Sequence, residues 1–116
     1  MSIVRRELEP ILANVVEAGS FIFTAGAIAD DTALDIKGQT RQALADLDRY
    51  LGMCGSSKSH ILSAVIWVAD IRLRSPMNDV WLGWVDPGQL PARACVEAKM
   101  ADPRCLVEIQ IVAVKR

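Results

Sequence analysis

Apolar residues recur at steps of three and four between Asp35 and Met53, and this spacing predicts an amphipathic helix over the range. The apolar positions are Ile36, Thr40, Ala43, Leu44, Leu47, Leu51 and Cys54. Gly55 follows directly, where glycine is the residue most often found just beyond a helix end. We therefore expect this helix to end near Met53 and to bury one face.

A second helix is expected from about Ser75 to Val85. Ser75 would be its N-cap and Pro76 its first helical residue, because serine and proline are favoured at those positions. Its inward stripe would consist of Met77, Val80, Trp81 and Trp84. We assign the two tryptophans to the core, although a ligand platform is the other interpretation.

Shorter apolar segments predict the strands. Residues 14–25 indicate two strands joined at Ala18–Gly19, the second ending near Ala25. Gly26 would then end or bend it, since glycine suits a close backbone approach. Residues 60–70 predict a long buried strand, and Ala92–Ala98 and Leu106–Val114 predict two more. The expected order is β-β-β-α-β-α-β-β.

Side chains alternate across a strand, so the last two strands predict two different sheet faces. One face takes Val107, Ile109, Ile111 and Ala113, and the other takes Glu108, Gln110, Val112 and Val114. In the preceding strand Arg93, Cys95 and Glu97 lie opposite Ala92, Ala94, Val96 and Ala98. We expect an α+β fold with a mixed sheet and two helices on one face. A monomer would leave the other, largely apolar face in water, whereas an oligomer would cover it.

Composition narrows the class of protein. The 116 residues predict one domain, 1–116, and 52% of them are hydrophobic. A net charge of −1 argues against a nucleic-acid-binding protein, and no apolar run is long enough for a membrane span. The N-terminal segment becomes charged within a few residues, unlike a signal peptide, so we expect a cytoplasmic protein. The charges of Arg5, Arg6 and Glu7 are assigned to solvent.

Cysteine and histidine offer little chemistry. Cys54, Cys95 and Cys105 share no zinc-type spacing, even with the single histidine, His60, so we expect reduced thiols and no metal. A Ser-His-Asp or Cys-His device would have to use His60. We favour instead a partly exposed residue at the entry to a strand.

Arg93 is the unusual residue of the segment QLPARACVEA, residues 89–98. A guanidinium is always charged and is rarely buried without a partner. Two interpretations are open. Arg93 forms a salt bridge with Glu108, on an adjacent strand or across an interface, or it is held in place to bind an anion.

Five segments together resemble the reactive intermediate deaminase A family, also called the YjgF or RutC family, whose members include proteins described as L-PSP endoribonucleases. They are FTAGAI, the long segment from GQTRQAL to VIWVAD, MNDVWLGWV, PARACVEA and VEIQIVAV. The resemblance extends over essentially the whole chain, and PAR-x-CVE followed by VEI is its most specific part. It is strongest toward the short YoaB-like branch.

The resemblance implies a fold and an activity. The fold is a chorismate mutase-like homotrimer, with the sheets facing inward and sites in the clefts between subunits. Family members hydrolyse enamines and imines such as 2-aminoacrylate to 2-keto acids and ammonia, without a metal or cofactor. The implied partners are a carboxylate-bearing imine and further copies of the chain, not nucleic acid or a membrane.

The family's site residues fall on identifiable positions here. Arg93 takes the place of the arginine that binds the substrate carboxylate, and Glu108 that of the acid that positions water and shuttles its proton. Backbone groups near Gly26 and Cys95 would contact the substrate, and Asn78 matches a recurrent asparagine. The chain departs from the family at two positions. Leu12 stands where many members have a tyrosine, and Ala25 stands where many have a serine.

Those two departures keep other functions open. Losing both hydroxyls makes the pocket more apolar, and each lost hydrogen bond changes affinity by up to about tenfold. One alternative is a non-catalytic trimer that binds keto acids or acts in regulation. Another is a hydrolase of amidated or carbamoylated three-carbon acids.

Overall fold

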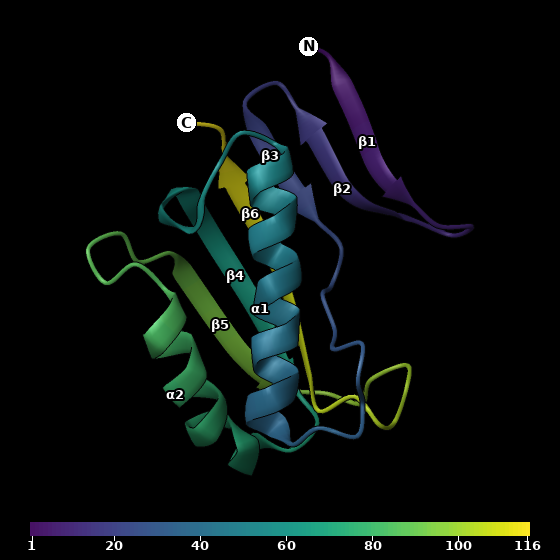
Figure 1. The fold of residues 1–116 in the computed structure, drawn as a ribbon, viewed down its shortest axis with the longest axis vertical. Coiled ribbons are helices and arrows are strands. Elements are labelled where there is room, and N and C mark those ends of the chain that lie inside the picture. Colours follow the sequence, from purple (N-terminus) through teal and green to yellow (C-terminus); the bar gives the residue numbers. More distant parts are fainter.

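The computed structural model describes all 116 residues, and a six-stranded mixed sheet forms its centre (Figure 1). The strands are β1 (Ile3–Leu8), β2 (Ala13–Ala18), β3 (Phe21–Thr24), β4 (Ile61–Val68), β5 (Ala92–Glu97) and β6 (Val107–Val114). Their order across the sheet is β1-β2-β3-β6-β4-β5. Only β4 and β5 pair in parallel. The predicted α+β class and mixed sheet are confirmed.

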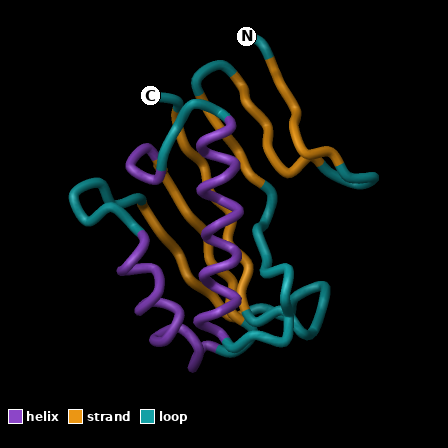
Figure 2. Tube along the Cα trace, in the orientation of Figure 1, coloured by secondary structure: helices purple, strands orange, loops and turns teal.

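Both long helices, α1 (Ile36–Met53) and α2 (Arg74–Trp84), cover the same face of this sheet (Figure 2). The predicted inward set of β6 lies beneath them, because Val107, Ile109, Ile111 and Ala113 are all buried. Met77 and Trp81 of α2 are buried in the same core, with Val80 and Trp84 packed at its border. No helix is long and apolar enough to cross a membrane.

The ends of α1 follow their sequence signals closely. Asp35 is the N-cap rather than the first helical residue, and its carboxylate accepts a hydrogen bond from the Gly38 amide at 2.8 Å. At the other end Gly55 has a φ of 70°, and the Ser56 amide donates to the Leu51 carbonyl. This is a Schellman ending, which needs a left-handed residue where glycine has no steric cost.

The predicted start of α2 is wrong. The helix begins at Arg74, with Leu73 as N-cap, so Ser75 and Pro76 lie inside its first turn. A short 3₁₀ turn, Ile71–Leu73, leads into it, and this turn is capped by the Asp70 carboxylate. Pro76 is tolerated because amides of the first helical turn have no intrahelical acceptor.

The last two strands, β5 and β6, are not neighbours in the sheet. Strand β4 lies between β5 and β6, and it pairs with β5 in parallel and with β6 antiparallel. A parallel pair needs a long crossover, which α2 supplies between β4 and β5. This order places β5 at one edge of the sheet, with β1 at the other.

The second face of the sheet is uncovered in a single chain. The large apolar residues on it include Phe21, Phe23 and Val96, which are 43%, 43% and 46% exposed. Val112 and Val114 of β6 lie on the same face, paired with Phe23 and Phe21. Contiguous exposed apolar surface of this kind marks an interaction site, and the expectation that further copies cover it stays a prediction.

Glu17, a buried acid on the helix-covered face, pairs with two cations. Its carboxylate accepts from Arg6 Nε at 2.6 Å and lies 2.8 Å from Lys115 Nζ. The Arg5–Glu7 segment is largely exposed, as the sequence suggested, but Arg6 pairs with Glu17 and Glu7 pairs with Arg49. The hydrogen bond from Lys115, followed by that from Arg6, lowers the pKa of Glu17 despite its burial.

Replacing Glu17 with glutamine should lower the free energy of unfolding by roughly 1–3 kcal/mol at pH 7. This is less than a fully buried pair would lose, because Arg6 and Lys115 both reach water. The lowered pKa means that Glu17 stabilises the fold above the unfolded-state value of about 4.3 and loses this effect as pH falls through the folded-state value. Urea denaturation at pH 7 and at pH 3, at fixed protein concentration, should show a smaller acid-induced loss in Glu17→Gln. Asp79→Asn, at an exposed ion pair with Lys37, is the control and should change stability by under about 1 kcal/mol.

Candidate active site

Arg93 lies on edge strand β5, with its side chain directed to the helix-covered face of the sheet. Its Nη1 donates to the Asn78 Oδ1 of α2 at 2.7 Å, and its guanidinium carbon lies 5.4 Å from the centre of the Trp81 ring. Burial lowers the pKa of the guanidinium, although an arginine still stays charged at neutral pH. No carboxylate of the chain lies within ion-pairing distance. Arg93 is thus a fixed, half-buried cation without an anion.

A hollow of about 290 Å³ opens beside this guanidinium. It is lined by Asn78, Trp81, Leu82, Leu90, Pro91 and Arg93. The lining comes from α2, from the loop after it and from the start of β5. The arrangement offers an anion a charged fork at one end of a largely apolar hollow.

Glu108 lies two strands away, on β6, with its side chain beside Gly26. The segment after β3 is held against β6 by two hydrogen bonds between Ala27 and Ile109, at 2.7 and 3.0 Å. A Cβ on Gly26 would lie only 2.0 Å from Glu108 Oε2. The close approach expected of this glycine is therefore present, and its purpose is to leave room for the Glu108 carboxylate.

A second hollow, also of about 290 Å³, contains Glu108. Trp67 of β4 forms one wall, since it pairs directly with Glu108 across the two strands. Residues 98–101, including Lys99, form the rest. Sequence reasoning missed Trp67 and Lys99. The alternation along β4 could have placed Trp67 on this face, but only once β4 was known to be the neighbour of β6.

The structure does not bring Arg93 and Glu108 together within one chain. Arg93 pairs with Ala64 and Glu108 with Trp67 along β4, and those two β4 residues point to opposite faces of the sheet. The mutual salt bridge considered from sequence is absent within the chain, because the strands are not adjacent and the side chains face apart. The predicted residues form two half-sites: Arg93 with Asn78, and Glu108 with Gly26.

The other predicted residues fall near one half-site or the other. Cys95 follows Arg93 on the same face of β5 and packs against the core border. Ala25 precedes Gly26, and its amide donates to the Asn14 carbonyl. Leu12 lines a hollow of about 380 Å³ together with Gly26. Ala25 is thus next to the Glu108 half-site, whereas the hollow at Leu12 is bordered by Asp46, Arg49 and Tyr50 of α1 and does not contain Glu108.

His60 takes no part in either half-site. Its Nδ1 lies 3.0 Å from the Ser57 hydroxyl, within the same short turn at the start of β4. Glu108 is aligned with the other end of that strand. The position at a strand entry is confirmed.

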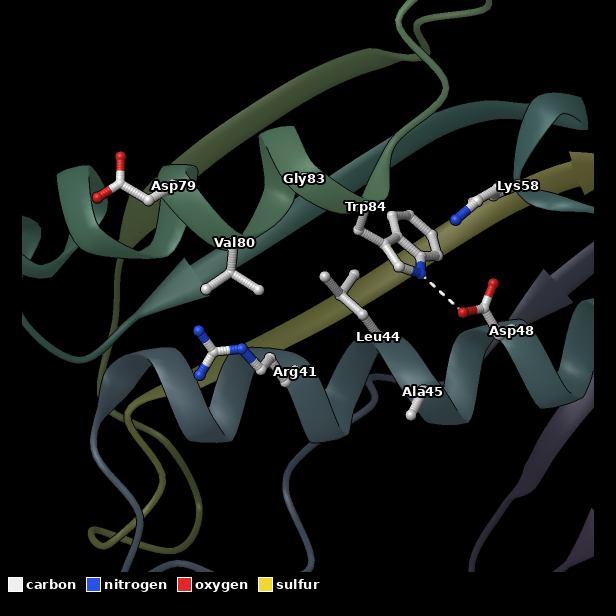
Figure 3. A pocket seen from close by; sticks show the side chains of 9 residues that line it. All are labelled: Arg41, Leu44, Ala45, Asp48, Lys58, Asp79, Val80, Gly83 and Trp84. Carbon is white, nitrogen blue, oxygen red and sulfur yellow. Dashed lines mark hydrogen bonds between the residues drawn. The ribbon is translucent and has the colours of Figure 1, made fainter.

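One further hollow, of about 370 Å³, lies between α1 and α2 (Figure 3). Most of its polar groups are engaged with each other. The Trp84 indole donates to Asp48 at 2.8 Å, Lys58 lies over the Trp84 ring, and Asp79 pairs with Lys37. It contains no predicted site residue, and we do not assign the activity to it.

Comparisons with known proteins place the chain in a family. A model of the family described as Endoribonuclease L-PSP matches residues 8–115. The RutC family protein YoaB of Escherichia coli is 37% identical over 113 residues, which cover 97% of this chain and 98% of YoaB. A crystal structure of NMB1025 from Neisseria meningitidis, a member of the YjgF protein family, has a TM-score of 0.97 at 43% identity and covers 100% of this chain and 97% of that one. The chain belongs to the YjgF/RutC family.

A RutC family protein of Haemophilus ducreyi is similar as well, at 34% identity over 96% of this chain and 95% of that protein. The family membership predicted from the sequence, including the similarity to YoaB, is confirmed. For this YjgF/RutC protein the roles of Arg93 and Glu108 in a binding or active site remain predictions, and substitutions can test them.

Gly26→Ala should move the Glu108 carboxylate and lower activity with little loss of stability. The nearest atoms that the added Cβ meets are Oε2, Cδ and Cγ of Glu108, at 2.0, 2.6 and 2.7 Å, so this surface side chain must turn to another rotamer. We expect kcat/KM for an imine to fall by about tenfold or more, since a carboxylate that has moved can no longer position water. The midpoint of thermal unfolding, measured in parallel, should change little. Gly52→Ala in α1, where a Cβ meets nothing within 4 Å, is the control and should keep activity while adding up to about 1 kcal/mol of stability.

Proposed function

We propose that this protein hydrolyses carboxylate-bearing enamines and imines, of the 2-aminoacrylate type, to 2-keto acids and ammonia. The observation that carries the proposal is Arg93, a half-buried cation held by Asn78 and Trp81 with no anion of its own chain. A planar guanidinium donates two parallel hydrogen bonds to a carboxylate, and such charge-assisted pairs are about twice as strong as neutral ones. The family to which the chain belongs supports the same assignment.

A complete site would form only between subunits. Arg93 and Glu108 lie on opposite faces of one sheet, so one subunit would supply Arg93 from its edge strand and its neighbour would supply Glu108 from its open face. The apolar open face gives the reason for assembly, and the family's homotrimer gives the expected stoichiometry. This arrangement also removes from solvent the phenylalanines that a single chain exposes.

The proposed chemistry needs only a positioned water and a proton shuttle. Arg93 holds the carboxylate and thereby fixes the imine carbon over the partner half-site. The Glu108 carboxylate accepts a proton from water as the water oxygen bonds to the imine carbon, and it passes this proton to the imine nitrogen, which gives a carbinolamine. Glu108 then accepts the hydroxyl proton of the carbinolamine and passes it to the nitrogen. The C–N bond breaks as the C=O bond forms, so that ammonia leaves and a 2-keto acid remains.

The test is keto-acid and ammonia release from imines generated in situ by an amino-acid oxidase. The oxidase product also hydrolyses on its own, so the readout is acceleration above that background. Acceleration proportional to the protein concentration supports the deaminase. A keto acid that binds without any acceleration would make the protein a binding module. Turnover of amidated or carbamoylated three-carbon acids that exceeds the turnover of imines would indicate a hydrolase of those acids instead.

A further inference from the structure

We infer that this site selects imines with a branched aliphatic side chain over those derived from three-carbon amino acids. The inference rests on the proposed function of Arg93 as the carboxylate clamp. The inference comes from the lining of the hollow beside that guanidinium. At about 290 Å³ this hollow is much larger than a carboxylate. The clamp fixes one end of the substrate, so the walls decide what the other end can be.

Two contacts of the polar end of this hollow are already made. Asn78 Oδ1 accepts from Arg93 Nη1, and the Trp81 ring lies against the guanidinium. The remaining lining is Leu82, Leu90 and Pro91, none of which has a side-chain donor or acceptor. A hydroxyl or amide on a substrate side chain placed among these three residues would lose its water without a replacement hydrogen bond from their side chains.

Leu82 and Leu90 supply the apolar walls from two separate elements. Leu82 is on α2 and Leu90 is on the loop that leads into β5, and they are 70% and 65% exposed. A side chain placed between them would remove apolar surface from water on both sides. Each buried methylene is worth about a fourfold gain in affinity, so the three extra carbons of a leucine-derived imine could give up to about 60-fold over an alanine-derived one.

The Glu108 half-site agrees with this selection, because Trp67 forms a wall of the hollow that contains Glu108 and offers apolar surface there. Arg74 is a second cation near Arg93. Burial has the largest effect in lowering the pKa of Arg93, and the charge of Arg74 lowers it further. Arg74 does not line the hollow, however, so a second carboxylate on the substrate would face leucine and proline instead.

The experiment compares imines generated in situ from alanine, leucine and aspartate. We expect kcat/KM to be at least tenfold higher for the leucine-derived imine than for the alanine-derived one, with the aspartate-derived imine lowest. In the double variant Leu82→Ser, Leu90→Ser this leucine-to-alanine ratio should fall to about threefold or less. Met53→Ser, at the exposed end of α1, is the matched control and should keep the wild-type ratio. A purely structural role for the leucines would lower both rates and leave the ratio unchanged.

Binding of the product keto acids separates failure of the selection from failure of the function. Calorimetry would measure the affinities of pyruvate and 4-methyl-2-oxopentanoate. If no imine is turned over but 4-methyl-2-oxopentanoate binds at least tenfold more tightly, the deaminase proposal is wrong and the selection stands. Turnover with equal kcat/KM for leucine and alanine imines, or with preference for the aspartate imine, would overturn the selection and leave the deaminase. Equal affinities without turnover would overturn both.

Discussion

Replacing Arg93 by alanine should reduce kcat/KM for imine hydrolysis by at least about 100-fold. A hydrogen bond to a charged group is worth about 1.5–3 kcal/mol, and the fork makes two of them to one carboxylate. Arg93 has no ion pair in the chain, so its removal breaks no salt bridge and leaves only Asn78 Oδ1 without its donor. Asn78 is half-buried and can turn toward water. Kinetics and gel filtration together should therefore show a loss of activity in an oligomer of unchanged size.

Two further variants sharpen this result. Arg93→Lys keeps the charge but loses the planar fork, so it should recover only part of the activity. Arg72→Ala removes an arginine whose side chain is 87% exposed and pairs only with Asp70, and it should leave the rate unchanged. An intact rate in Arg93→Ala would refute the clamp assignment. Loss of the oligomer in Arg93→Ala would show that the residue serves assembly instead.

The elements of this fold could be predicted from sequence wherever the signal was local. The steps of three and four gave α1, and alternation gave the two faces of β6, because both depend only on neighbours along the chain. The ends were predicted where one residue decides them, as Gly55 does. Ser75 misled because a favourable N-cap residue followed by proline also fits inside a first helical turn, and the 3₁₀ turn before it has no sequence signal of comparable strength.

The arrangement of the site could not be predicted in the same way. Fifteen positions separate Arg93 from Glu108, and the sequence left open whether the two meet in a salt bridge on adjacent strands. The strand order is set by pairing between β4 and β6, segments about 40 residues apart, and no local pattern records it. The resemblance gave the correct family, but it did not show that β4 lies between β5 and β6. It therefore left open whether Arg93 and Glu108 lie on the same face of the sheet. The two half-sites emerged only from the register.

Glu108→Gln should lower kcat for imine hydrolysis by about 10²–10⁴-fold while a keto acid still binds. An amide cannot accept the proton of the attacking water, and general acid–base catalysis contributes an effect of this size. Glutamine has nearly the same shape, so the contact with Gly26 is preserved. Calorimetry with the preferred keto acid would show retained affinity in Glu108→Gln and lost affinity in Arg93→Ala. A kcat within tenfold of wild type would remove Glu108 from the proposed chemistry.

Mixed oligomers then decide whether the two residues come from different chains. Each variant alone lacks one half of every cleft. If Arg93 of one subunit acts with Glu108 of its neighbour, co-expressed Arg93→Ala and Glu108→Gln chains with two different tags should regain about a quarter of the wild-type activity, because random cyclic trimers join two intact halves in that fraction of clefts. If one chain supplied both residues, no cleft in any mixture would contain the pair, and activity would stay at the level of the single variants. The opposite faces that β4 imposes on Arg93 and Glu108 lead us to expect recovery.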